Sequence, residues 1–257
     1  MFISLCYIGV QYYMKRQKLR KLLLTLSFFL FPITLFYFSP YLIIQGGFEG
    51  IISGSFLTFA VLFLFSLLFG RAFCSWVCPA GGLQECLFPA VDKRITNKKI
   101  NLIKYFIWIP WLIGILAAFL TAGGVHSVDF FYMTEHGISA AGMPGLITYF
   151  LILTLITVLA LLLGKRGMCH SICWMAPFMI LGTKLKELLP IPSLKLTADS
   201  SACISCKQCT GKCPMSLEVQ EMVLKNNMRN SECILCGECA DTCPKKLIKL
   251  SFNHTRK

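Results

Sequence analysis

Four long apolar stretches constrain the fold of this 257-residue chain more than any other feature. They run from Leu22 to Ile44, Ile51 to Gly70, Leu102 to Thr121 and Leu146 to Gly164. Each is close to the roughly 20 residues that a helix needs to cross about 30 Å of hydrocarbon. Charged residues make up only 14% of the chain and apolar residues 56%, which disfavours a single water-soluble globule. The sequence therefore predicts a mainly α membrane protein with four transmembrane helices, two of them kinked, at Pro32 and Pro110.

Basic residues cluster on one side of these predicted spans. The 13 Lys and Arg of residues 1–183 fall in 15–21, 71–104 and 165–166, and none falls in the connections 41–50 and 122–145. The positive-inside rule then places both termini in the cytoplasm of a bacterial or archaeal cell membrane, with the chain multi-pass and in contact with lipid. The formal charge of +13 is thus an orientation signal, and no nucleic-acid partner is expected.

Composition changes along the chain predict four segments. Met1 to Tyr13 is apolar but too short to span, so it is either an interfacial segment or an over-extended start before Met14. Pro190 and Pro192 punctuate a later junction, before which Pro177 to Leu189 could lie on the membrane as an amphipathic helix. The expected segments are a cytoplasmic N-terminal segment, a membrane domain, a linker or interfacial segment and a soluble domain, at 1–21, 22–183, 184–202 and 203–257.

The soluble segment contains a duplicated cysteine motif. Its two copies, 30 residues apart, both read Cys-x2-Cys-x2-Cys-x3-Cys-Pro. This is the bacterial ferredoxin pattern, in which the fourth cysteine ligates the other cluster. The pattern predicts a small α+β domain with two 4Fe-4S clusters. One would be held by Cys203, Cys206, Cys209 and Cys243, and the second by Cys233, Cys236, Cys239 and Cys213.

Other uses of these eight cysteines are weaker. Disulfides are disfavoured because the predicted topology places the thiols in a reducing compartment, and zinc sites rarely use two tandem runs of this spacing. So small a domain has little core, and we expect the clusters to supply much of its folding free energy.

A second duplication, at an offset of 95 residues, follows the second and fourth apolar stretches. It consists of two Cys-x3-Cys pairs, Cys74 with Cys78 and Cys169 with Cys173. Residues four apart on a helix share one face, so each pair could present two sulfurs to one centre in a pseudo-symmetric bundle. Three interpretations stay open: a further metal or cluster, a quinone or cofactor pocket, and simple packing of small side chains.

Together these motifs resemble the NapH family, the membrane iron-sulfur subunit of quinol dehydrogenases that serve periplasmic nitrate reductase. The resemblance covers roughly residues 20 to 250 and depends on Gly70-Arg-Ala-Phe-Cys-Ser-Trp-Val-Cys-Pro79, on Cys169-x3-Cys173 and on the tail. The membrane portion of NosR is similar. The resemblance implies quinol oxidation in the membrane and delivery of electrons to redox partners. One departure is that Trp174, not proline, follows Cys173.

Quinol oxidation releases two protons as well as two electrons, so titratable groups near the membrane border are candidates for catalysis. In the connection 122–145 these are His126, Asp129, Glu135 and His136, near the aromatic run Phe130-Phe-Tyr132. On the other side are His170, Glu85 and Asp92. A solvated loop with aromatic anchors is the plainer interpretation of the first group. Cys6 and Cys86 have no repeat partners and are assigned to packing.

These features favour membrane-bound electron transfer between the quinone pool and a redox partner, such as a ferredoxin, a cytochrome or a reductase subunit. The protein would then be a component of a quinol dehydrogenase. The alternative is an accessory, maturation or redox-sensing protein for a periplasmic metalloenzyme or flavoprotein. A third interpretation treats the spans as a mere anchor for a ferredoxin. Both directions of electron flow fit, because cluster potentials span about −700 to +450 mV.

Overall fold

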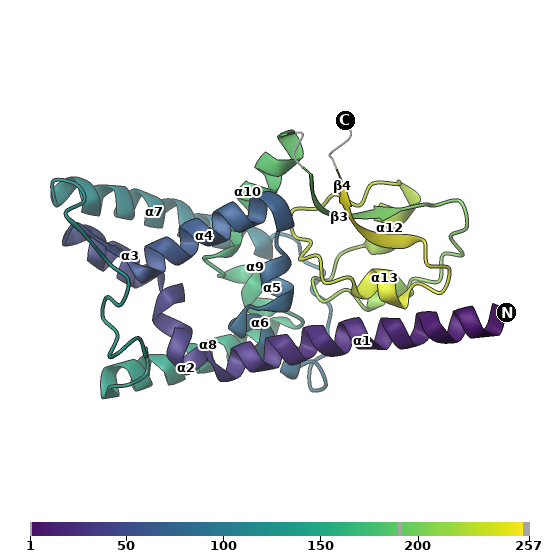
Figure 1. Ribbon diagram of the computed structural model, residues 1–257, viewed down its shortest axis with the longest axis horizontal. Helices are drawn as coiled ribbons and strands as arrows, with labels where there is room; N and C mark the ends of the chain where they lie inside the picture. Colours follow the sequence, from purple (N-terminus) through teal and green to yellow (C-terminus); the bar gives the residue numbers. More distant parts are fainter. Residues whose placement is uncertain (1, 190–191, 254–257) are drawn as a thin grey trace.

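The computed structural model describes residues 2–189 and 192–253, with side chains from Lys15 onward. A helical half occupies one end of the long axis, and a small half with short helices and a two-stranded sheet occupies the other (Figure 1). The helical half contains α1 (Phe2–Phe29), α2 (Phe31–Thr34), η1 (Leu35–Phe38), α3 (Pro40–Phe48), α4 (Gly54–Phe69), α5 (Ala72–Trp76), α6 (Pro79–Cys86), α7 (Ile100–Thr121), α8 (Met143–Leu163), α9 (Gly167–Ser171) and α10 (Ala176–Leu188), with strands β1 (Ile51–Ser53) and β2 (Ser127–Asp129).

Two of the described helices, α7 and α8, are long and apolar enough to cross a membrane. A third candidate is a broken span, in which Lys15–Phe29 and Phe31–Phe38 meet at a bend of 58°. The remaining predicted span, Ile51 to Gly70, corresponds to α4, an apolar helix of only 16 residues. The mostly helical prediction is confirmed, whereas the count of four transmembrane helices is not.

Prolines explain where the first predicted span divides. Pro32 lies in the first turn of α2 and Pro40 opens α3, positions where a missing N–H costs nothing. The Ser39 side chain caps α3 by accepting a hydrogen bond from the Leu42 N–H at 3.4 Å. Pro110, in contrast, lies inside the continuous helix α7. The apolar run from Leu22 to Ile44 is therefore several helical segments rather than one rod.

The offset of 95 residues is visible in the backbone. Helix α5, Ala72–Trp76, corresponds residue for residue to α9, Gly167–Ser171. Both follow a long apolar helix that ends at a glycine with positive φ, 56° at Gly70 and 107° at Gly164, where a side chain would be strained. The two hairpins therefore deliver their cysteine pairs in similar local structures.

The segment Pro177 to Leu189, which could lie on a membrane surface, forms most of helix α10. Helix α10 lies against α4, with Met179 and Ile180 buried. The approach is close at Gly182, where an added Cβ would meet the Ser66 Oγ. One side of α10 thus packs on α4, while Leu181, Leu185 and Leu188 stay 49%, 37% and 78% exposed, so contact with the membrane surface stays a prediction.

The small half is the cysteine-rich tail, defined here as residues 193–253. Strands β3 (Ser193–Ala198) and β4 (Ile248–Asn253) pair antiparallel, with Ser193 opposite Asn253. Short helices α11 (Gln208–Gly211), α12 (Val219–Leu224) and α13 (Glu238–Thr242) lie between them. Since β3 is part of this sheet, the folded unit begins ahead of the predicted boundary at residue 203.

Helix α1 holds the tail against the helical half. It runs unbroken from Phe2, and its Arg16 pairs with Asp241 while the Gln17 Nε2 donates to the Cys236 carbonyl at 3.1 Å. A second strap comes from Arg94, which pairs with Glu218 at 2.8 Å. Basic residues counted above as an orientation signal therefore also bind the tail. The alternatives for Met1, the side chain of Cys6 and the backbone at Pro190 lie outside the described residues.

Candidate iron-sulfur centres and an apolar cavity

The structure gathers the eight tail cysteines around two separate cavities. One, which we call the distal cavity, is lined by Cys203, Cys206, Cys209 and Cys243. The other, the proximal cavity, is lined by Cys213, Cys233, Cys236 and Cys239. Each cavity thus combines three cysteines of one motif with the fourth of the other, in the grouping that the ferredoxin pattern predicts.

The backbone around both cavities has the same shape. Ser205 and Lys207 have φ of 54° and 58°, and their equivalents 30 residues on, Leu235 and Gly237, have 53° and 73°. Left-handed residues alternating with ordinary ones turn successive N–H groups inward, which is the nest arrangement used around anions and iron-sulfur clusters. Helices α11 and α13 start directly after Lys207 and Gly237.

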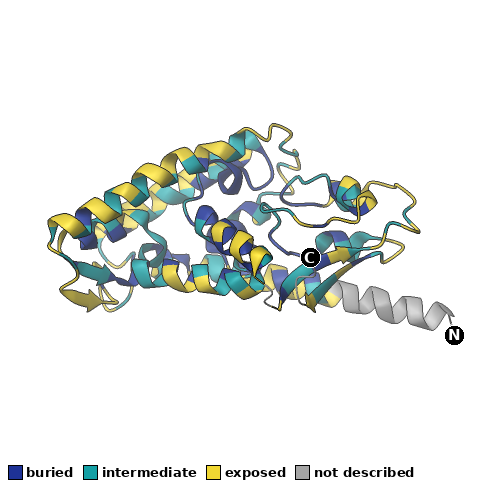
Figure 2. Ribbon diagram, turned by 90° about the horizontal axis from the view of Figure 1, so that it is seen from above, coloured by how far each residue is buried: buried dark blue, intermediate teal, exposed yellow. Residues whose placement is uncertain are grey.

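The two cavities differ in exposure. Cys206 is exposed, whereas Cys236 and Cys239 are buried at the junction with the helical half (Figure 2 shows the buried centre). Burial raises the pKa of Cys236 to about 12, and a metal bound to its sulfur would favour the thiolate. The proximal site is therefore enclosed by protein, and the distal site faces outward.

The four remaining paired cysteines, which we call the inner cysteines, are all buried. They are Cys74, Cys78, Cys169 and Cys173. Burial raises the pKa of Cys78 well above its usual range, and its three companions lie close enough to raise it further. The Gln84 Nε2 lies 3.3 Å from the Cys169 Sγ, and the Cys74 Sγ lies 3.6 Å from the Met179 Sδ. The two pairs thus come together at one place.

The expected helical face for each pair is not what the structure shows. Helix α5 ends at Trp76, and the Cys78 N–H binds the Phe73 carbonyl at 3.0 Å. Cys173 repeats this with Met168 at 3.1 Å. Cys78 is extended because Pro79 follows it, and a residue before proline avoids the helical region. Each pair therefore straddles the end of a short helix and a tight turn.

Buried charges flank the inner cysteines. Arg71 and Arg166, three residues before Cys74 and Cys169, are 1% and 0% exposed. The Arg71 Nη1 lies 2.7 Å from the Glu232 Oε2 of the tail, and Arg166 pairs with Glu85. Within the described residues, no three His, Cys, Asp or Glu side chains are arranged to hold a single metal ion, the tail cysteines included.

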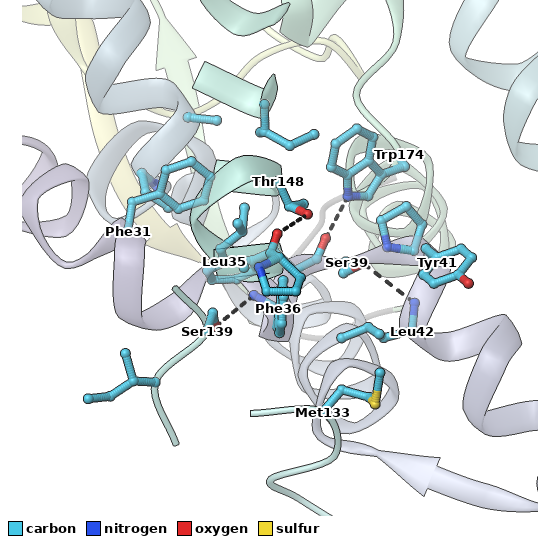
Figure 3. A pocket seen from close by; sticks show the side chains of 18 of the residues that line it. Phe31, Leu35, Phe36, Ser39, Tyr41, Leu42, Met133, Ser139, Thr148 and Trp174 are labelled. Atoms are coloured by element: carbon cyan, nitrogen blue, oxygen red, sulfur yellow. Dashed lines mark hydrogen bonds between the residues drawn. The ribbon is translucent and has the colours of Figure 1, made fainter. Parts of the chain in front are cut away.

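An apolar cavity of about 590 Å³ adjoins the inner cysteines (Figure 3). Most of its lining is aromatic or aliphatic, drawn from α2, η1, α3 and α8. One part is formed by Pro79 and Trp174, the residues that follow Cys78 and Cys173, and another by Glu135. The Trp174 Nε1 donates to the Phe38 carbonyl at 2.8 Å. The cavity therefore extends from the cysteine turns to the connection 122–145.

Two polar groups in this lining matter for ligand binding. The Gln45 Oε1 is buried without a hydrogen-bond partner among the described residues, which is costly unless a ligand donates to it. Glu135 also lines the cavity and is itself exposed. Neither the Gln45 amide nor Trp174 was identified as a site residue from sequence. The only signal for Trp174 was its replacement of the expected proline.

The other candidate proton groups lie elsewhere. His126 and His136 are exposed and do not line the apolar cavity. His170 is buried between α9 and α7, where its Nδ1 lies 2.8 Å from the Asn101 Oδ1. Burial lowers the pKa of His170 to about 4, so it is neutral at physiological pH. Cys86 is exposed and belongs to neither cysteine group, while Asp92 pairs with Lys165.

Comparisons with known protein families match both halves. A family described as "4Fe-4S binding domain" matches residues 54–100 and 146–192, which contain the two inner cysteine pairs. A second, "4Fe-4S dicluster domain", matches residues 195–244. The chain therefore carries 4Fe-4S ferredoxin-type domains, and the prediction of iron-sulfur chemistry is confirmed.

Curated relatives point to the same class. The chain is 26% identical to "Putative electron transport protein YccM" of Escherichia coli (strain K12), over 71% of this chain and 52% of that protein. It is 27% identical to "Uncharacterized protein MJ0749" of Methanocaldococcus jannaschii, over 65% of this chain and 61% of that protein. The aligned region thus spans between half and two thirds of these relatives. No solved structure matches. These findings support a role in electron transfer.

Proposed function

We propose that the protein transfers electrons between a quinol bound in the apolar cavity and a redox partner that docks at the distal cavity, in a cell membrane with both termini cytoplasmic. The observation that carries this proposal is that the inner cysteines pack both with the cysteines of the proximal cavity and with residues of the apolar cavity. Cys74 and Cys169 share one buried core with Cys236 and Cys239, while Cys78 and Cys173 share another with the cavity residues Phe31 and Met168.

The cavity suits a quinone by volume, lining and polar groups. Ligand sites of about 300–1,000 Å³ are usually apolar with a few placed polar atoms. Here the unpartnered Gln45 Oε1 can accept a hydrogen bond from a quinol hydroxyl, and the Glu135 carboxylate can accept a proton. The aromatic rings of Phe31, Phe36 and Trp174 can pack against the quinone ring.

Oxidation of one quinol yields one quinone, two protons and two electrons. Iron-sulfur clusters, when bound, accept and release single electrons. The residues assigned to them are the two groups of four tail cysteines described above, which we propose hold two 4Fe-4S clusters. Glu135 receives the two protons one after the other at the cavity, and the exposed connection 122–145 returns each of them to water. The electrons leave in sequence through the proximal and then the distal site.

The distal cavity is the exit toward a partner. Among the described residues that line it, Lys207 and Lys245 are basic and exposed, none is acidic, and Ile204 is 59% exposed. An exposed apolar side chain together with two lysines suits brief docking of an acidic redox protein.

The test is cluster reduction by a menaquinol analogue in anaerobic, reconstituted full-length protein. Thr148→Trp places an indole in the cavity, and Ile147→Trp, one residue along α8 and outside the lining, is the matched control. We expect rapid reduction of the wild type and the control, and a rate at least about tenfold lower for Thr148→Trp. Dithionite should reduce all three. No reduction of the wild type by quinol, with clusters that dithionite still reduces, would refute the proposal.

A further inference from the structure

The inner cysteines are surrounded by more buried positive charge than negative charge. Four cations lie there with at most 5% exposure: Arg20, Arg71, Lys104 and Arg166. Glu85 is shared by Arg20 and Arg166, and Glu232 by Arg71 and Lys104. A third carboxylate, Glu238, reaches only Arg20, at 3.4 Å. The four buried cations therefore outnumber their three carboxylate partners by one, and an uncompensated positive charge is costly inside a protein.

Two of these guanidinium groups are aimed at the cysteines and have spare donors. The Nε atoms of Arg71 and Arg166 are buried without hydrogen-bond partners among the described residues. The Arg166 Nη1 binds the Cys74 carbonyl at 2.7 Å and lies 4.0 Å from the Cys169 Sγ. Arg71 lies close enough to Cys74 and Cys173 to interact electrostatically with both. These unpartnered donors beside the inner cysteines favour an anionic group that accepts hydrogen bonds.

We infer that Cys74, Cys78, Cys169 and Cys173 hold a third 4Fe-4S cluster, with Arg71 and Arg166 as its charge-balancing pair. An oxidised cubane with four thiolates carries about two negative charges, which offsets the excess described above. The four thiols release four protons as iron binds. The match of residues 54–100 and 146–192 to a 4Fe-4S binding domain includes each pair and its arginine.

This assignment deepens the proposed function, because it gives the electrons a centre between the cavity and the tail. The second cysteine of each pair faces the cavity core, and the first faces the proximal core. A cluster bound there would accept the two electrons of one quinol one at a time and pass each to the proximal site before taking the next, so no atoms are transferred. Membrane anchoring alone would require neither the buried cysteines nor their arginines.

The deciding experiment counts iron and acid-labile sulfide in the full chain after anaerobic reconstitution to saturation. Three cubanes require about twelve irons and twelve sulfides per chain, and two require about eight. We expect about twelve. A saturated value of about eight would overturn the inference even if quinol still reduced the protein. Twelve irons without quinol reduction would refute the proposed function and leave the inner cluster standing.

Variants locate the additional cluster. Cys74→Ser with Cys169→Ser should lose about four irons while the tail clusters keep their electron paramagnetic resonance signals. Cys86→Ser, at an exposed cysteine outside the groups, is the control and should lose none. Arg166→Gln should keep the iron and shift one midpoint potential downward, because a positive charge near the cluster is removed. Iron content unchanged in the double variant would contradict the assignment, and wild-type iron content decides the question if that variant fails to fold.

Discussion

The Ser75 hydroxyl donates a hydrogen bond of 2.7 Å to the carbonyl of Ile234. Ser75 follows Cys74 in the first hairpin, and Ile234 follows Cys233 in the tail. One hydrogen bond therefore joins the backbone of an inner cysteine loop to that of the proximal loop, across 159 residues of sequence. Both partners are buried, so water cannot replace either of them.

Ser75→Ala should loosen the tail. The Ile234 carbonyl would lose its donor, at a cost of about 1–3 kcal/mol for a buried unsatisfied acceptor. We expect faster amide hydrogen exchange in residues 233–239 and a lower unfolding temperature. Ser201→Ala, at an exposed serine of the same tail, should change neither. Equal exchange in both variants would mean that this hydrogen bond does not hold the domains together.

Cys243→Ser should damage the distal site although Cys243 belongs to the second motif. In the structure it lines the cavity of Cys203, Cys206 and Cys209. We expect these three thiols to become reactive to an alkylating reagent, while Cys233, Cys236 and Cys239 stay protected. Mass spectrometry of the labelled peptides measures this directly. If protection is lost within the second motif instead, the two motifs do not exchange their fourth ligands.

Sequence reasoning reached the features that local spacing determines. The cysteine groups follow from motifs whose consecutive members lie three or four residues apart, and the repeat of α5 in α9 follows from the offset of 95 residues. Helices α7 and α8 follow from uninterrupted apolar runs. The division of the first apolar run was only partly predictable, since a proline in a membrane helix can kink it without breaking it.

Long-range contacts were not predictable in the same way. Arg71 was counted as a basic residue at a membrane border, yet it is 1% exposed and pairs with Glu232, 161 residues away. Helix α10 has the amphipathic pattern of a surface helix, and only the position of α4 shows that Met179 and Ile180 are covered by protein. Gln45 belongs to no sequence motif. Its proposed role depends on its buried Oε1 atom, which has no hydrogen-bond partner among the described residues.

Reversing charge at the distal cavity should change electron exit without touching the buried centres. Lys207→Glu with Lys245→Glu replaces the two lining lysines. Oxidation of the dithionite-reduced protein by ferricyanide, an anion, should slow on the order of tenfold at low salt. Oxidation by hexaammineruthenium, a cation, should accelerate. Both effects should shrink as salt screens the charges, and an equal response to the two oxidants would show that the lysines do not steer the approach.

Glu135→Gln should slow quinol oxidation while leaving cluster content intact. The carboxylate lines the cavity, and loss of a general base typically costs about 100-fold or more. Glu135→Asp should retain a larger part of the rate. The control is His136→Gln, because His136 is the exposed neighbour that does not line the cavity. Stopped-flow reduction by a quinol analogue separates the variants, and a larger loss in His136→Gln would assign the proton transfer to the histidine.

Glu85 should be the most sensitive carboxylate for stability. It lies between the guanidinium groups of Arg20 and Arg166, both at most 2% exposed. Burial alone would raise the pKa of Glu85, but these two cations outweigh burial and lower it below its ordinary value of 4.5. The charged carboxylate therefore stabilises the fold fully above pH 4.5, and this contribution is lost as pH falls through the lowered pKa.

Glu85→Ala leaves two buried cations without their shared partner, which costs about 3–5 kcal/mol at neutral pH. Asp92→Ala is the matched control, since Asp92 is 79% exposed and its partner Lys165 still donates to the Gly211 carbonyl at 3.3 Å, so we expect a loss of about 1 kcal/mol or less. Denaturant unfolding in detergent, followed by tryptophan fluorescence, measures both. The gap between the wild type and Glu85→Ala should narrow as pH falls below 4.5, because protonation removes the charge that the substitution removes. A gap that stays constant with pH would show that Glu85 acts through packing rather than through its charge.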